Sequence, residues 1–223
     1  MRLGMTVCDR NGRDVCVAGM VERARRRLKD TLLRCGKAFS FVYDPPGDNL
    51  IMDHPNHSHP LHLNPPGAPY KCNGCKELGF GPSYGCEICN YILHEECANV
   101  DRLAFHRFFP KSHFEFFEKA PGYRTRYCDA CGKDVLGFVY HCSQTGFDLH
   151  PCCLKLKDSV CDKDGCVTLK LSQKVPRKCL KYKSRNVVNK VKGWSYVSCN
   201  EDNNSCYHVS CVKELILENW KRG

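Results

Sequence analysis

Two stretches of this chain, residues 72–97 and 128–153, decide its fold: they read CNGCKELGFGPSYGCEICNYILHEEC and CDACGKDVLGFVYHCSQTGFDLHPCC. Both begin with a Cys-x2-Cys pair, reach a third cysteine after ten further residues and end in a histidine and cysteine spaced His-x2-Cys. These positions in the first stretch recur 56 residues later in the second. Thiolates and imidazoles at such short spacings are the ligands that zinc takes in structural sites. The repeat therefore predicts a tandem array of small zinc modules.

The composition favours metal over disulfide bonds. The 223 residues include 19 cysteines and 10 histidines, and modules of this size bury too little apolar surface to fold without a staple. Residues 1–20 contain no apolar run of signal-peptide length, and no stretch approaches the roughly 18 apolar residues of a membrane span. We therefore expect an intracellular protein of the cytoplasm, the nucleus or both, whose reduced thiols are free to bind zinc.

The repeat divides the chain into an extension and three modules: residues 1–50, 51–106 (module one), 107–165 (module two) and 166–223 (module three, degenerate). The extension has a basic helical pattern over residues 21–33, with Gly36 as its stop. Residues 113–117 alternate as a β-strand does, and residues 212–220 favour a short helix. We expect an α+β protein of short β-hairpins, a short helix after each His-x2-Cys pair, and little hydrophobic core.

A Cys-x2-Cys pair supplies only half of a tetrahedral zinc site, so a distant pair must supply the rest. In small two-zinc modules the pairs interleave, the first pair with the third. This rule predicts one complete site in each of the first two modules. The ligands are Cys72, Cys75, His94 and Cys97 in module one, and Cys128, Cys131, His150 and Cys153 in module two.

The second sites are less complete. In module one, Cys86 and Cys89 need two further ligands, for which His59 and His106 are the candidates. In module two, Thr145 stands where the partner of Cys142 should lie. The candidate ligands that remain are His113, Cys142 and Cys161. These three residues either bind zinc weakly, recruit His141 as a fourth ligand, or leave the site empty.

Module three departs further from the repeat. Tyr182 stands where the second cysteine of the opening pair should lie, so one rearranged zinc fits this module and two do not. The candidate ligands are Cys179, Cys199, Cys206, His208 and Cys211, with Cys166 in the place of the opening histidine. In all we expect about three to five zinc ions per chain.

The charge is uneven along a chain whose formal net charge is +10. Between Val167 and Asn200 there are nine lysines and arginines and no acidic residue. Such a stretch is either a solvated loop or a surface for the phosphates of nucleic acid or anionic lipid. The residues expected to contact such a partner, within the basic stretch 170–192, are Lys178, Lys181, Lys183 and Arg185. The aromatic side chains available for stacking on bases are Tyr182, Trp194 and Tyr196.

The motif of residues 54–63 (HPNHSHPLHL), 84–97 (YGCEICNYILHEEC) and 139–153 (VYHCSQTGFDLHPCC) resembles the C1 zinc domain of protein kinase C. It is more closely similar to the plant cysteine/histidine-rich divergent C1 family, over roughly residues 51–220. The resemblance implies zinc binding, no catalysis, and a signalling role through protein or lipid contacts. Diacylglycerol binding is not expected, because residues 76–85 form a shorter segment without the Gln-Gly of responsive domains.

Other classes fit less well. A PHD-type chromatin reader would take Cys128 and Cys131 as ligands for module one and would leave the repeat unexplained. A protein-disulfide redox enzyme would place Cys-x2-Cys at the start of a helix in a βαβ unit, whereas these pairs lie in loop-like sequence. A catalytic zinc needs an open position and a general base, and no His-Glu-x-x-His motif is present. We therefore predict a non-catalytic adaptor without catalytic residues.

Overall fold

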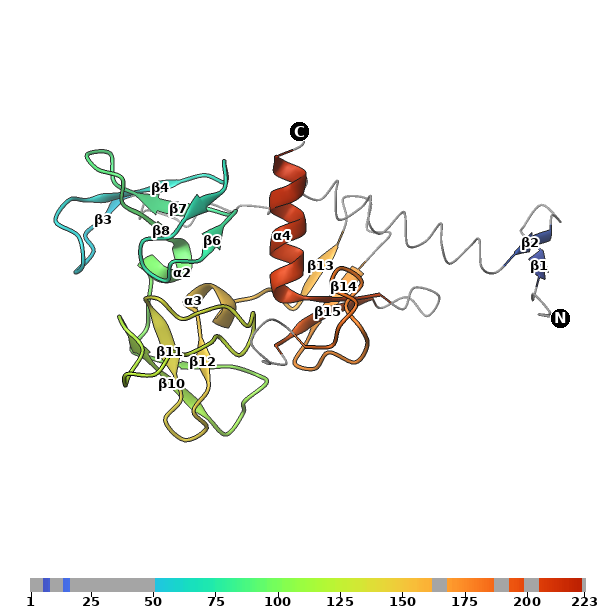
Figure 1. Cartoon of the computed structure of the whole chain (residues 1–223). Helices are drawn as coiled ribbons and strands as arrows, with labels where there is room; N and C mark the ends of the chain where they lie inside the picture. The colour runs from blue at the N-terminus through green and yellow to red at the C-terminus, as the bar shows by residue number, and fades with distance from the viewer. Residues whose placement is uncertain are drawn as a thin grey trace.

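The computed structural model describes residues 6–8, 14–16, 51–161, 168–186, 193–198 and 205–221 (Figure 1). Before residue 51 it describes a two-stranded antiparallel hairpin of β1 (Thr6–Cys8) and β2 (Asp14–Cys16). The predicted basic helix over residues 21–33 lies outside the described residues, as do Cys166 and Cys199. None of the helices in the described ranges has the length and apolar character needed to cross a bilayer.

Module one is built on a four-stranded antiparallel sheet. The strand order is β3-β4-β7-β8, with β3 (Ile51–Met52), β4 (Leu61–Asn64), β7 (Ser83–Gly85) and β8 (Ile92–His94). A small second sheet pairs β5 (Tyr70–Lys71) with β6 (Leu78–Gly79), so the pair Cys72 and Cys75 lies in the turn between these two strands. Helix α2 (Glu95–Ala98) follows β8 directly.

Module two repeats this plan with strand order β12-β11-β10-β9. Its strands are β9 (Leu103–Phe105), β10 (His113–Phe117), β11 (Val139–His141) and β12 (Asp148–Leu149), and helix α3 (Pro151–Leu154) follows. The strand predicted over residues 113–117 is confirmed as β10.

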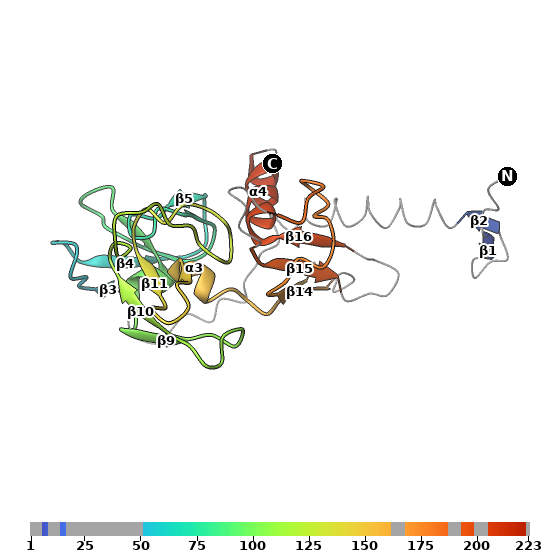
Figure 2. The ribbon, with the colours of Figure 1, turned by 60° about the horizontal axis from the view of Figure 1, so that its bottom comes forward.

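Module three has a third four-stranded antiparallel sheet and the longest helix of the described residues. The sheet joins β13 (Ser159–Cys161), β14 (Thr168–Ser172), β15 (Ser195–Ser198) and β16 (Cys206–His208), in that order, and α4 (Val209–Trp220) follows β16 (Figure 2). Because β13 hydrogen-bonds to β14, the sheet of this module begins before residue 166. Helix α4 starts earlier than the predicted residue 212.

Each helix begins inside the His-x2-Cys pair rather than after it. His94 and His150 are the N-cap residues of α2 and α3. Pro151 occupies the first turn of α3, where a missing N–H costs nothing. The cysteine three residues beyond the histidine therefore lies on the same helical turn. This local geometry brings the thiol and the imidazole together before any tertiary contact forms.

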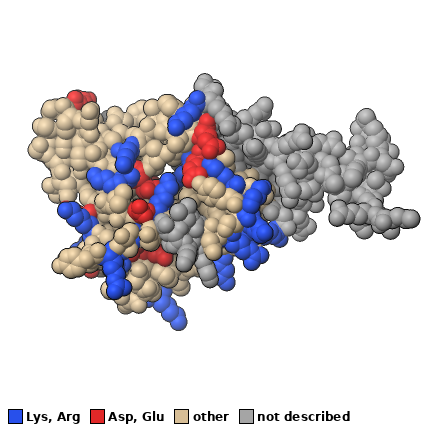
Figure 3. Space-filling model, in the orientation of Figure 1, with Lys and Arg blue, Asp and Glu red and all other residues tan. Residues whose placement is uncertain are grey.

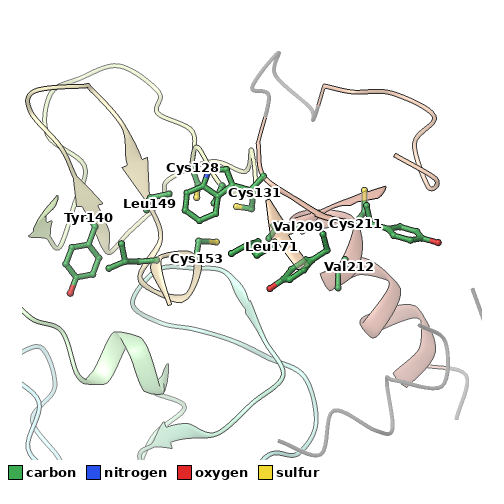
Figure 4. Packing of buried hydrophobic residues seen from close by; sticks show 14 of the residues in the cluster. Cys128, Cys131, Tyr140, Leu149, Cys153, Leu171, Val209, Cys211 and Val212 are labelled. Atoms are coloured by element: carbon green, nitrogen blue, oxygen red, sulfur yellow. The ribbon is translucent and has the colours of Figure 1, made fainter. Parts of the chain in front are cut away.

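The hydrophobic core is shared between modules. One cluster of buried residues runs continuously from Tyr140 and Leu149 of module two to Leu171 and Val209 of module three (Figure 4). A second cluster in module one, around Leu61 and Leu93, includes Phe138 of module two. Buried cysteines line both clusters. The modules therefore complete one another's cores.

Modules one and two meet at a backbone contact that leaves no room for a side chain. The Phe138 N–H donates to the Gly74 carbonyl oxygen at 3.1 Å. A Cβ at buried Gly137 would lie 2.0 Å from that same oxygen. Since the obstacle is backbone, the two modules would have to separate to admit even a methyl group.

We predict that Gly137→Ala destabilises the packed pair of modules by about 1–3 kcal/mol, the usual cost of overpacking. Urea unfolding of the metal-loaded chain measures this loss. Gly67→Ala is the matched control, because a Cβ there meets only the Pro65 oxygen, at 3.9 Å. Equal stability of the two variants would contradict the close packing of this interface.

Candidate metal centres

The described residues form four groups in which cysteine and histidine ligand atoms lie within 4.8 Å of one another. Three groups offer four ligands and one offers three. We name them site one (Cys72, Cys75, His94, Cys97), site two (Cys128, Cys131, His150, Cys153), site three (His57, His59, Cys86, Cys89) and site four (Cys179, His208, Cys211).

Site one has the ligands predicted from the interleaved pairs. Cys72 and Cys75 come from the β5–β6 turn, and His94 and Cys97 from the start of α2. The Nδ1 atom of His94 lies 3.3 Å from Cys75 Sγ and 3.7 Å from Cys97 Sγ. A tetrahedral zinc, about 2.3 Å from sulfur and 2.0–2.1 Å from nitrogen, sets such atoms about 3.6 Å apart. The group therefore fits zinc.

Site two repeats this geometry in module two and adds a hydrogen bond that orients its histidine. His150 Nδ1 lies 3.5 Å from Cys131 Sγ and 4.0 Å from Cys153 Sγ. On the other side of the ring, Nε2 lies 3.2 Å from the Asp134 carbonyl oxygen, which can only accept a hydrogen bond. The proton on Nε2 leaves the Nδ1 lone pair facing the thiols, as metal ligation requires.

Site three holds the second metal position of module one, and its histidines are His57 and His59. Cys89 Sγ lies 3.3 Å from His57 Nε2 and 3.8 Å from His59 Nδ1, and Cys86 Sγ lies 3.7 Å from His59 Nδ1. The His57 ring stacks on Tyr91 with centroids 4.2 Å apart, which holds it beside the cysteines. Cys89 is exposed, so this site is more open than sites one and two.

The structure does not bring His106 to this group. The His106 ring lies instead 4.7 Å from the Trp194 ring, where burial lowers its pKa. Its Nδ1 accepts a hydrogen bond from the Phe108 N–H at 3.1 Å. His57 occupies the place that the sequence prediction gave to His106. The only sequence signal for it is the His57-x-His59 spacing, which places two imidazoles close together in an extended loop.

Site four keeps three ligands of the repeat. Cys179 Sγ lies 3.5 Å from Cys211 Sγ, and His208 Nδ1 lies 3.6 Å from Cys211 Sγ. His208 Nε2 faces the Arg185 carbonyl oxygen at 3.3 Å, the arrangement already seen at His150. Cys206 is buried but belongs to no described group, and Cys199 lies outside the described residues.

Hydroxyl groups replace the second metal site in module two. The register of β4 on β7 pairs His62 with Gly85, and that of β10 on β11 pairs Glu115 with His141, so residue 112 matches position 59. Residue 112 is a buried serine, and hydrogen bonds from Thr145 and Ser112, working against burial, lower the pKa of the Cys142 thiol. Positions that hold metal ligands in module one thus hold hydroxyls around Cys142.

The other candidates for that site lie elsewhere. His113 is an exposed residue of β10. His141 Nδ1 lies 2.9 Å from Asp148 Oδ1, and Arg126 donates to Asp148 Oδ2 at 2.8 Å. This cluster around the buried Asp148 has no signal in the sequence. The Cys161 side chain lies outside the described residues, and no metal-ligand group includes Cys142 among the residues that are described.

The ligand groups concentrate negative charge in the interior. Burial lowers the pKa of His94, but the thiolates of Cys152 and Cys72 outweigh it and raise that pKa to about 9. In site four a hydrogen bond with Cys211 lowers the pKa of the Cys179 thiol to about 3, and the same contact raises the pKa of Cys211. One thiolate in such a pair opposes ionisation of the next, and a divalent cation between them removes that opposition.

Comparison with known proteins agrees with the geometry. Residues 55–98 and 110–154 each match the model of the C1 domain family. The chain therefore carries two copies of the divergent C1 domain, the family that the sequence motif resembles, and each copy encloses one buried Cys/His group. No curated protein and no solved structure matches the chain.

We predict that Cys75→Ala removes one zinc ion from the chain and unfolds module one, because metal-binding energy is folding energy in such modules. Native mass spectrometry counts the metal, and amide hydrogen exchange of residues 70–98 reports the unfolding. Cys206→Ala, at a buried cysteine outside every described group, is the control and keeps the full zinc count. A folded Cys75→Ala chain with unchanged zinc content would refute the assignment of site one.

The choice between His57 and His106 can be tested directly. His57→Ala is expected to lose the zinc of site three, since it leaves three ligands at a partly exposed position. His106→Ala is expected to keep it. Zinc release to a chromogenic chelator, compared with native mass spectra of the two variants, measures the difference. Loss of zinc in His106→Ala alone would contradict the assignment.

Proposed function

We propose that this protein is a zinc-stabilised, non-catalytic adaptor that acts in signalling by binding other macromolecules. The observation that carries this proposal is the closure of sites one and two. Their eight ligand side chains are no more than 5% exposed, and four protein ligands fill each coordination sphere. A catalytic zinc keeps one position for water or substrate, so the metal in these sites has a structural role.

At site four, the carboxylate that lies next to the ligands is already engaged. Next to site four, the Tyr182 hydroxyl donates to Glu214 Oε2 at 2.7 Å, and Lys181 Nζ lies 2.9 Å from the same atom. This carboxylate is therefore engaged and does not act as a general base. The Cys-x2-Cys pair of site one lies in a β-turn rather than at a helix N-terminus, which argues against disulfide redox chemistry.

Cobalt substitution tests the closed coordination. A tetrahedral cobalt–thiolate site with four protein ligands keeps its visible absorption spectrum when azide or cyanide is added, because no position is open to the anion. We expect no spectral change from sites one and two. The measurement uses a variant in which the cysteines of sites three and four are replaced by alanine. A new absorption band on adding the anion to this variant would contradict the non-catalytic assignment.

Module three supports a second candidate function, binding to phosphate-bearing surfaces. Within the described residues 168–186 its exposed cations are Lys170, Lys174, Arg177, Lys178, Lys183 and Arg185. Figure 3 shows Lys and Arg side chains gathered on the surface of the protein. Lys181 does not belong to this surface, since its Nζ lies 2.9 Å from Glu214 and 2.7 Å from Glu218. Trp194 and Tyr196 are 2% and 3% exposed, so they offer no platform for bases. Of the three aromatic residues considered for stacking, only Tyr182 is exposed, and its hydroxyl is held by Glu214. These features favour an anionic membrane over single-stranded nucleic acid, in an intracellular compartment where the thiols stay reduced.

We predict that changing Lys178, Lys183 and Arg185 to Glu weakens binding to phosphatidylserine-containing vesicles by roughly a hundredfold or more. Each cation near an anionic membrane contributes about 1 kcal/mol. The control changes Lys111, Lys119 and Arg124, three exposed cations of module two, and alters the net charge equally. Flotation across a salt series measures binding. Equal loss in both triple variants would contradict a localised surface, and binding to nucleic acid without vesicle binding would reassign the partner.

A further inference from the structure

A cation of module three reaches the metal centre of module two. The Nζ atom of Lys213, on α4, lies 3.5 Å from Cys152 Sγ and 3.8 Å from Cys153 Sγ. Cys153 is a ligand of site two, and Cys152 precedes it on α3 without belonging to any described group. An ammonium group at these distances donates hydrogen bonds to sulfur. The helix of one module thus contacts the coordination sphere of another.

Site two needs such a cation. A zinc ion with three thiolates and one neutral imidazole carries one net negative charge. The four ligands of site two are all 0% exposed, so water does not balance this charge. An uncompensated charge in the interior is costly unless it is paired. Lys213 is the cation that the described residues place against these sulfurs, and the backbone N–H groups nearby carry only partial charges.

Other groups around Lys213 belong to all three modules. Glu77 of module one has a buried Oε2 atom without a hydrogen-bond partner, and that atom lies 3.8 Å from Nζ of Lys133 in module two. Cys152 contributes to the core clusters of both module one and modules two and three. A cavity of about 380 Å³ opens beside these residues, lined by Tyr70, Cys152, Tyr196 and Lys213. Residues of all three modules therefore meet beside Cys152 and Lys213.

We infer that Lys213 is the outer-sphere, charge-compensating residue of site two and that it couples docking of α4 to the metal in that site. This inference rests on the proposed structural role of zinc. With zinc bound, the net negative charge of the site holds the ammonium group at the junction. Without the ion, the four ligand side chains are no longer held together, and the ammonium group loses the fixed arrangement of sulfur atoms against which it docks. The coupling is reciprocal, so Lys213 also strengthens the binding of zinc in site two.

We expect zinc in site two to affect the docking of α4 and not the position of the whole of module three. Module three has further contacts with module two, among them the Trp194 N–H donating to the Ala130 carbonyl oxygen at 2.8 Å. The buried apolar cluster also continues across this boundary. These contacts do not involve Lys213. Loss of its charge is therefore expected to loosen α4 and site two while the sheet of module three stays in place.

The test uses the full zinc-loaded chain with three variants. Lys213→Met keeps the length and apolar stem of the side chain but removes the charge, Lys213→Arg keeps the charge, and Lys221→Met removes an exposed cation just beyond α4. Pulsed alkylation in the presence of a chelator reads each site separately. Cys128 and Cys131 report on site two away from the non-ligand Cys152, and Cys86 and Cys89 report on site three.

We expect Lys213→Met to bind the same number of zinc ions as the wild type at saturating metal. Its site-two thiols should become alkylated about tenfold faster, in line with the loss of an outer-sphere partner, while the thiols of site three, Cys86 and Cys89, are unchanged. Amide exchange across α4 should also accelerate. Lys213→Arg is expected to stay close to the wild type, and Lys221→Met to match it.

Chelation supplies the reciprocal measurement. Removing zinc from the wild type should speed amide exchange in α4. Removing zinc from Lys213→Met should increase the exchange rate of α4 much less. Wild-type rates in Lys213→Met, or equal losses in the Met and Arg variants, would overturn the inference while leaving the zinc sites intact. A wild-type chain without bound zinc, with thiols unprotected in all sites, would overturn the proposed function itself.

Discussion

The structure depends on one coordination unit: a histidine and a cysteine three residues apart at the start of a short helix, joined to a cysteine pair in a distant turn. The first pair is arranged locally, because the helix begins within it. The second pair is brought in only by the fold, and the metal fixes the two together. Sites one and two each link the β-turn to the following helix across roughly twenty residues. Modules of this size cannot obtain that closure from apolar burial alone, so the ligands act as the staples of the fold.

Modules two and three lack some of the ligands that module one has. In module two, Ser112 and Thr145 stand at positions that hold ligands in module one, and their hydroxyls hydrogen-bond with Cys142. Module two also shares a continuous core with module three, which module one does not. In module three, Tyr182 takes the place of a ligand and instead ties its hydroxyl to α4 through Glu214. At these positions of modules two and three, hydrogen bonds stand where module one has metal ligands.

The sequence predicted the zinc-module fold and the ligands of sites one and two, because His-x2-Cys and Cys-x2-Cys have fixed local spacing and recur together. The strand over residues 113–117 followed from alternation. The sequence could not show whether His57 or His106 belongs to site three, because several histidines precede the first cysteine pair. The His57 ring is held beside the cysteines by stacking on Tyr91, which spacing does not reveal. The buried pair of Arg126 and Asp148 and the reach of Lys213 to site two, 60 residues away in sequence, depend on tertiary packing that no local pattern carries. The limits of the modules stay predictions, although β13 already pairs with module three.

The most direct test of the account is native mass spectrometry of the fully reduced chain before and after zinc is stripped by a chelator. The account predicts at least three bound zinc ions with a compact charge-state distribution. It also predicts a shift to the highly charged ions of an extended chain once the metal is gone. A stripped, reduced chain that keeps the compact distribution would contradict it, because the apolar clusters would then hold the fold without the metal.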